Sequence, residues 1–74
     1  MDIRLRVGKN MKRLRQAQGW SQEELADRSG YHRTYISGIE RGVRNPTVTV
    51  IDQLANTLKA SPAEFFEIPG KPGK

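Results

Sequence analysis

The segment RTYISGIERG (residues 33–42) contains only two large aliphatic residues, Ile36 and Ile39. They are three positions apart, which is the spacing of residues on one face of an α-helix. At 100° per residue, the opposite side of that helix carries small and polar residues: Thr34, Ser37, Gly38 and Arg41. We therefore predict a helix over residues 33–41 that packs by one side only. Its polar side is available for another role.

The preceding segment predicts a second, shorter helix. Ser21 is a favourable N-cap, and Glu24 three positions later completes the pattern of a capping box. The helix is expected from Gln22 to about Ser29, followed by a tight turn with Gly30 at its pivot. Two helices joined by a short glycine-containing turn have the geometry of a helix-turn-helix.

The rest of the chain also has helical rather than alternating spacing of apolar residues. The expected buried stripes are Ile3, Val7, Met11 and Leu14 in a first helix, and Val48, Ile51, Leu54, Ala55 and Leu58 in a fourth helix capped by Thr47. A fifth helix is expected after Ser61, with Pro62 in its first turn and Glu64 closing a capping box. The predicted fold is all-α: a compact five-helix bundle over residues 1–68. Residues 69–74 (PGKPGK) are expected to form a disordered basic tail.

Composition restricts the possible functions. The 74 residues include no Cys and one His, which argues against thiol chemistry, a thiolate zinc site or another metal site. The sequence contains no pair of acidic residues that would suggest a catalytic cleft. We therefore expect that the protein is not an enzyme and uses no cofactor. No apolar run approaches a membrane span or a signal peptide, so we expect no membrane partner. The absence of Cys fits a cytoplasmic protein.

The net charge is +5, and it is unevenly distributed. Residues 1–20 contain six Lys/Arg and one Asp, whereas residues 21–40 contain two Arg and four acids. A small basic protein favours polyanions, and nucleic acid is the first candidate.

The span from Val7 to Phe66 resembles the phage repressor/Cro (XRE-like) family of helix-turn-helix proteins. The resemblance is carried by Leu14-Arg15, GWSQEELA (19–26), Gly30, YISGIERG (35–42), Asn45-Pro46 and LANTLKASPAEFF (54–66). Within the family, RTYISGIERG looks most like restriction-modification controller proteins, and it is similar to other small stand-alone regulators. The resemblance implies a lambda-repressor-like DNA-binding domain and a sequence-specific transcriptional regulator, located on the nucleoid when bound to its operator.

The same resemblance implies specific contacts with double-stranded DNA, with residues 33–41 in the major groove. Arg33, Thr34 and Ser37 are the expected base-reading residues, and Arg33 suits the O6 and N7 atoms of guanine. Contacts to the DNA backbone are expected from Gln22, Tyr35, Arg41, Arg44 and Asn45. Two of these residues have an alternative role. Tyr35 could pack on the second helix, and Arg44 could enter a narrow minor groove.

Three further positions bear on the orientation of the third helix. An ion pair between Arg15 and Glu40 is expected to fix it, because the family often joins these two positions. His32 stands where the family usually has Ser, Thr or Asp as a helix cap. Gly38 stands where relatives often have a long polar residue. We attribute this glycine either to close approach of the DNA backbone or to clearance for Ser37 and Arg41.

One such domain contacts few base pairs, so the resemblance implies a homodimer on a palindromic operator. Phe65, Phe66 and Ile68 are the expected interface residues, with one of the two Phe in the core and the other partly at the interface. No small-molecule ligand is evident. One alternative is an antitoxin that binds a toxin and represses its own operon. Another is a general nucleic-acid or RNA binder, although the basic residues lack interleaved aromatics.

Overall fold

The computed structural model describes residues 2–68, which form four α-helices and one short 3₁₀ helix without strands. The elements are α1 (Ile3–Ala17), α2 (Gln22–Ser29), α3 (Arg33–Glu40), α4 (Val48–Leu58) and η1 (Pro62–Phe66). The all-α prediction agrees with this structure, but the fifth element is a 3₁₀ helix rather than an α-helix. This element has only five residues before the backbone becomes extended at Glu67, and so short a segment forms the tighter turn of a 3₁₀ helix. The predicted tail lies outside the described residues.

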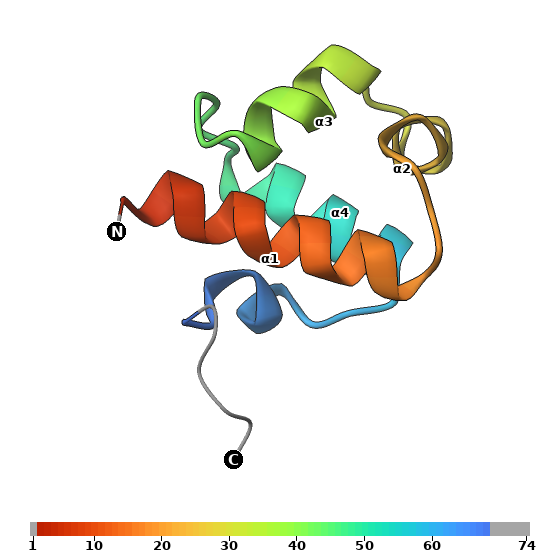
Figure 1. Cartoon of the computed structure of the whole chain (residues 1–74). Helices are drawn as coiled ribbons and strands as arrows, with labels where there is room; N and C mark the ends of the chain where they lie inside the picture. Colours follow the sequence, from red (N-terminus) through yellow and green to blue (C-terminus); the bar gives the residue numbers. More distant parts are fainter. Residues whose placement is uncertain (1, 69–74) are drawn as a thin grey trace.

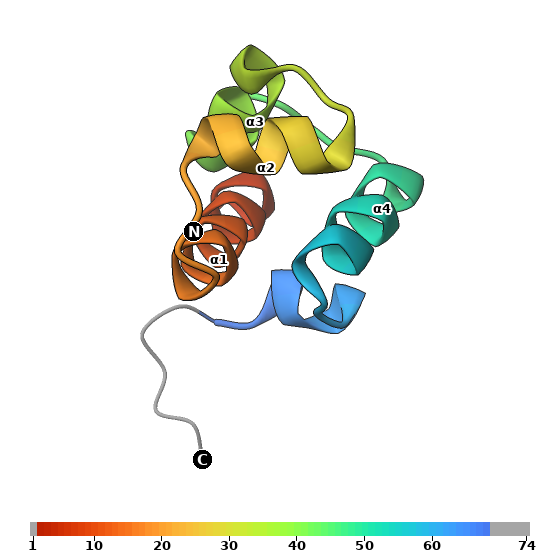
Figure 2. The same ribbon diagram turned by 90° about the vertical axis from the view of Figure 1, so that its right-hand side faces the viewer.

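The helices are arranged in layers around α1 and α4 (Figure 1). α2 and α3 contact each other and cover one side of these two helices, whereas η1 lies on the other side and contacts both α1 and α4 (Figure 2). α1 also contacts α3, so this one helix connects α3 to η1. None of the helices in residues 2–68 combines the length and the apolar content that a membrane crossing requires.

Every element contributes to one apolar core. Its members are Val7, Met11, Leu14, Leu25, Ala26, Ile36, Ile39, Ile51, Leu54, Ala55, Leu58 and Phe65. Two residues of the predicted stripes are not among them, because Ile3 is 50% exposed and Val48 is 80% exposed. Both lie in the first turn of their helices, at the edge of the bundle, where no element of residues 2–68 covers them.

Side-chain caps begin three of the four α-helices and η1. Asp2 caps α1, and a hydrogen bond from the Arg4 side chain lowers the pKa of its carboxyl group. The Ser61–Glu64 capping box is present, as predicted. At α2, the Ser21 hydroxyl accepts a hydrogen bond from the Glu24 N–H at 3.0 Å. The Glu24 carboxylate pairs with Arg28 instead of returning to the cap, so the predicted box at α2 is only half formed.

Asn10 attaches η1 to α1. Its side chain is buried, and Nδ2 donates to the carbonyl oxygens of Phe65 at 2.9 Å and Glu67 at 2.7 Å. These bonds satisfy backbone acceptors at the end of η1. Asn10 was not among the residues predicted from the sequence, although a polar residue three positions after Val7, on the buried stripe, was a signal of such a role.

Gly8 sets the distance between α1 and the end of α3. A Cβ atom at this position would lie 2.2 Å from the carbonyl oxygen of Ile39 and 2.8 Å from that of Glu40. Backbone atoms on both sides leave no flexible group to move away. The absence of a side chain at Gly8 therefore allows α3 to pack directly against α1.

We expect Gly8→Ala to lower the free energy of unfolding by about 2–3 kcal/mol, because one added methyl group forces α1 and α3 apart. Urea denaturation followed by circular dichroism measures this change. Lys9→Ala is the matched control, since Lys9 is exposed one position further along the same helix. Equal stability of the Gly8 and Lys9 variants would contradict the close contact.

Candidate nucleic-acid interface

α2 and α3 form a helix-turn-helix. α2 ends at Gly30, whose backbone is left-handed (φ 84°), and α3 begins at Arg33 after a turn of two residues. Ala26 on α2 and Ile36 and Ile39 on α3 are buried. The inner side of α3 is thus fixed in the core, and its outer side remains free.

The outer side of α3 is polar. Arg33 and Thr34 are exposed in its first turn, and Ser37 is half-buried one turn later. The Ser37 hydroxyl accepts a hydrogen bond from Nε of Arg41, the exposed C-cap residue, at 3.4 Å. The positive charges and hydroxyl groups of this surface suit a polyanion that also presents hydrogen-bonding edges.

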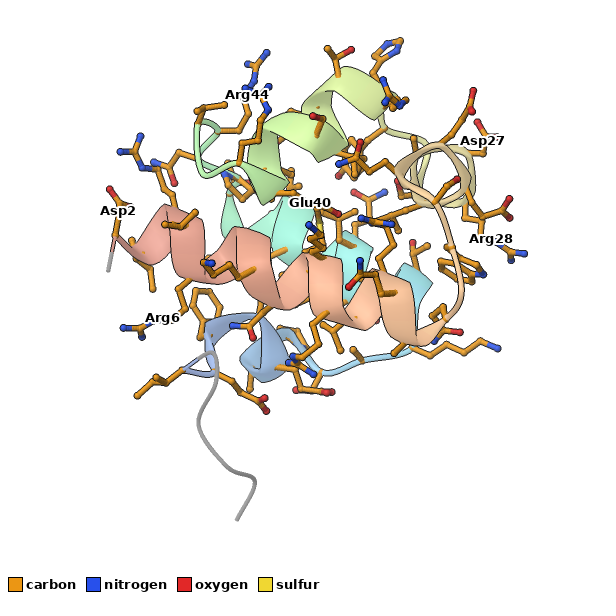
Figure 3. All side chains as sticks on the ribbon, in the orientation of Figure 1. Asp2, Arg6, Asp27, Arg28, Glu40 and Arg44 are labelled. Carbon is orange, nitrogen blue, oxygen red and sulfur yellow. The ribbon has the colours of Figure 1, made fainter. Side chains whose placement is uncertain are left out.

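The loop after α3 extends this surface. Arg44 and Asn45 are exposed, and Figure 3 shows Arg44 beside α3, on the side of the molecule away from η1. The guanidinium carbon of Arg44 lies 5.8 Å from the centre of the Tyr35 ring. The centre of the Tyr35 ring is itself 5.5 Å from that of Tyr31 in the turn. Tyr35 therefore belongs to the same surface as Arg44, as a half-buried support.

The predicted pair of Arg15 and Glu40 is present and joins α1 to α3. Nε of Arg15 donates to Oε2 of Glu40 at 2.7 Å, and its Nη2 donates to Oε1 at 3.0 Å. The side chains are only 10% and 4% exposed. Nη1 of Arg15 donates to the Trp20 carbonyl oxygen at 2.7 Å, so the guanidinium group also fixes the segment that leads into α2. The pair connects three helical segments.

Gln22 is a member of the same network. Its Nε2 donates to Oε1 of Glu40 at 3.1 Å, and the residue is half-buried. An amide group has two N–H donors. One of them is occupied by Glu40, which leaves the second for a ligand at the start of α2. The network thus positions a residue that was expected to contact the DNA backbone.

Gly38 has a different environment from the one expected. A Cβ atom at this position would lie 2.6 Å from Cγ of Arg44. The space beside Gly38 is therefore occupied by Arg44. The absence of a side chain at Gly38 makes room for Arg44, and not for Ser37 and Arg41 as expected. His32 is the N-cap of α3 and makes no capping hydrogen bond through its side chain, in line with its departure from the usual cap residues.

Part of the positive charge of α1 lies away from α3. Figure 3 shows Arg6 on the side of α1 that faces η1. Arg13 makes an ion pair with Glu67, just after η1, at 3.2 Å. These residues therefore do not extend the surface around Arg33, Arg41 and Arg44. No group of three His, Cys, Asp or Glu side chains within residues 2–68 is arranged to bind a metal ion.

The expected dimer residues fall into two classes. Phe65 is fully buried in the core, so its assignment to the interface was wrong. It lies near the end of η1, which contacts α1 and α4, and the two hydrogen bonds from Asn10 hold the backbone there. Phe66 is 41% exposed and Ile68 is also exposed, which fits the expectation of one core Phe and one surface Phe.

Phe66 borders an apolar hollow of about 160 Å³. The lining residues include Ile3, Val7, Pro46, Val48, Ile51 and Phe66. Ile3 and Val48, which were predicted to be buried but are exposed, therefore lie in the same apolar patch as Phe66.

Comparison with known proteins identifies relatives. The helix-turn-helix family model HTH_3 matches residues 11–65 of this chain. The uncharacterized HTH-type transcriptional regulator y4dJ of Sinorhizobium fredii is 48% identical over 65 residues, which are 88% of this chain and 84% of that protein.

Two solved structures of restriction-modification controller proteins are also similar. C.AhdI from Aeromonas hydrophila superimposes with a TM-score of 0.81 at 43% identity, covering 85% of this chain and 96% of that one. C.Esp1396I, whose tetramer was crystallised with its natural 35 base-pair operator, superimposes with a TM-score of 0.79 at 38% identity. That match covers 89% of this chain and 87% of the controller.

We expect Glu40→Leu to lower the free energy of unfolding by about 3 kcal/mol or more, because it leaves the buried Arg15 guanidinium without its counter-charge. Adding Arg15→Met should restore most of the loss, since an apolar pair of similar volume replaces a buried ion pair at little cost. Urea denaturation of the single and double variants measures both effects. A double variant that is less stable than the Glu40 variant alone would contradict this account.

Proposed function

The chain belongs to the helix-turn-helix family HTH_3, among transcriptional regulators that include restriction-modification controller proteins, and we propose that it regulates transcription by binding a specific sequence in double-stranded DNA. In this proposal α3 enters the major groove. One observation carries it: Ile36 and Ile39 fix α3 by its inner side while Arg33 and Thr34 are exposed in its first turn.

Base recognition is assigned to Arg33, Thr34 and Ser37. The fork of the Arg33 guanidinium matches the N7 and O6 acceptors of guanine, and the Thr34 methyl and hydroxyl groups match thymine or a base edge. Ser37 lies one turn further along α3 and keeps its hydroxyl oriented by the hydrogen bond from Arg41. These three residues supply the direct sequence discrimination of the proposed complex.

Contacts to phosphate are assigned to Gln22, Tyr35, Arg41, Arg44 and Asn45. They lie at the start of α2, in the first turn of α3, at the end of α3 and in the loop that follows. Contacts of this kind set the register of the protein on DNA without reading sequence. The free donor of the Gln22 amide and the exposed guanidinium groups of Arg41 and Arg44 support this assignment.

A homodimer on a palindromic operator completes the proposal. One α3 reaches only a few base pairs, and a twofold dimer doubles the recognised sequence. The exposed Phe66, which lines the apolar hollow with Ile3 and Val48, and the exposed Ile68 two residues later support a dimer surface at this edge of the bundle. The relative C.Esp1396I binds its operator as a tetramer, which supports operator binding by an assembly of several copies.

The test of the proposed function is selection from a pool of random DNA duplexes with the purified protein, at near-physiological salt. We expect enrichment of a palindrome with half-sites about one helical turn apart. Binding without enrichment, which weakens steeply as salt rises, would contradict sequence-specific regulation. That result would direct attention to a protein partner and to the antitoxin alternative.

We predict that Arg33→Ala relaxes the sequence preference by about 1–3 kcal/mol at one base pair of each half-site, because a bidentate contact is lost. Competition binding of the enriched duplex against single-base variants measures this preference. Arg44→Ala is the comparison variant and should weaken binding to all duplexes about equally, because its contact is assigned to phosphate. Equal losses on the enriched duplex and on random DNA for Arg33→Ala would overturn its assigned role.

We predict that the double substitution Phe66→Ser and Ile68→Ser weakens the dimer by at least tenfold, because two apolar side chains leave the proposed interface. Sedimentation equilibrium measures the dissociation constant. Val43→Ser is the matched control, since Val43 is an equally exposed apolar residue outside the hollow. An unchanged dimer in the double variant, with helix content retained, would place the interface elsewhere.

A further inference from the structure

The end of α3 folds the following loop back over its last turn. The Gly42 N–H donates to the Ile39 carbonyl oxygen and the Val43 N–H to that of Gly38, both at 3.0 Å, around the left-handed backbone of Gly42. This is the bond pattern of a Schellman cap. The Arg44 N–H also donates to the Gly38 carbonyl oxygen, at 3.2 Å. The backbone of Arg44 is therefore fixed directly above Gly38.

The side chain of Arg44 occupies the space that Gly38 leaves free. A Cβ atom at position 38 would lie 2.6 Å from Cγ of Arg44, 3.4 Å from Nε and 3.5 Å from Cδ. The Arg44 stem thus runs along the surface of α3 across the glycine. Any larger residue at position 38 would displace this stem.

An aromatic ring supports the charged end of the same side chain. The guanidinium group of Arg44 lies 5.8 Å from the centre of the Tyr35 ring, within the range of a cation–π contact. Tyr35 packs on Tyr31 at a tilt of 50°. The Tyr31 hydroxyl donates to Oε1 of Gln53 on α4 at 2.6 Å. The ring that supports Arg44 is therefore itself supported by Tyr31, which a surface hydrogen bond attaches to α4.

We infer that Gly38 and Tyr35 are positioning residues that hold Arg44 against α3 in the free protein, ready for contact with DNA. The inference rests on the proposed function. An arginine side chain loses much rotamer freedom when it binds, and a side chain that is already ordered loses less. Gly38 thereby acts through Arg44, and its role differs from close approach of the DNA backbone to the helix.

Gly38→Ala separates these two roles. An added methyl group favours the helical backbone but displaces the Arg44 stem. We expect the melting temperature to stay the same or rise while the affinity for the enriched duplex falls by about three- to tenfold, as expected for the loss of one ordered side chain. In an Arg44→Ala background, the same substitution should change affinity by less than about twofold, because no stem remains to be displaced.

Substitutions of Tyr35 combined with Arg44→Ala provide a second double-mutant cycle. Tyr35→Phe keeps the ring, and we expect it to retain the coupling between position 38 and Arg44. Tyr35→Leu removes the ring and should lower affinity by more in the presence of Arg44 than in an Arg44→Ala background. A loss common to both backgrounds belongs to the DNA-backbone contact of Tyr35 itself. Arg28→Ala is the matched control for the loss of an arginine that lies over an aromatic ring. The guanidinium carbon of Arg28 is 4.4 Å from the centre of the Trp20 ring, and Arg28 lies far from Arg44 (Figure 3).

Two results would overturn the inference. One is an equal loss of affinity for Gly38→Ala with and without Arg44, which would show that the helix itself needs the glycine. The other comes from the free protein, without DNA: the Arg44 Nε–H resonance should be shifted by the Tyr35 ring and lose that shift in Gly38→Ala. An unshifted resonance in the unsubstituted protein would refute positioning. Failure of the proposed function differs from both, because then no duplex is enriched at all.

Discussion

The buried ion pair between Arg15 and Glu40 determines how α3 is oriented. It joins the end of α1 to the end of α3. Nη1 of Arg15 also donates to the Trp20 carbonyl oxygen, and Nε2 of Gln22 donates to the Glu40 carboxylate. A pair of this kind adds little net stability compared with apolar residues, since both charges lose their hydration. Its value is directional: only one arrangement of the helices satisfies both charged groups. The missing side chain at Gly8 permits the same arrangement by allowing the two backbones to touch.

α3 depends on these contacts because it is too short to be stable alone. It has eight residues, and isolated helices of this length do not persist in water. Its N-cap side chain makes no capping bond, and Gly38 further disfavours the helical backbone. Burial of Ile36 and Ile39, the ion pair of Glu40 and the folded-back loop compensate. The surface proposed for DNA recognition is thereby kept rigid, although the helix that carries it has a weak propensity of its own.

α1 connects this surface to the edge of the molecule that is proposed for the dimer. On one side Gly8 and Arg15 contact α3, and on the other Asn10 holds the backbone of η1. Phe66 and Ile68, the residues proposed for the dimer, therefore have a fixed position relative to Arg33 and Thr34. In a twofold dimer, the separation of the two α3 helices must match one turn of DNA. Rigid attachment of both α3 and η1 to one helix is a direct way to set that separation.

The sequence by itself determined the helical elements, the caps at Ser21, Thr47 and Ser61, and the polar side of α3, because these depend on periodicity and on hydrogen bonds between near neighbours. The resemblance to a known family supplied the pair of Arg15 and Glu40. Two local contacts, that of Glu24 with Arg28 and that of Arg44 beside Gly38, were not predicted, although their partners are only four and six residues apart. The tertiary structure alone decided that Phe65 is buried and Phe66 exposed. The physical reason is that two adjacent residues in a pattern are equivalent until another element occupies the space beside one of them. Which element does so depends on contacts between residues far apart in the chain.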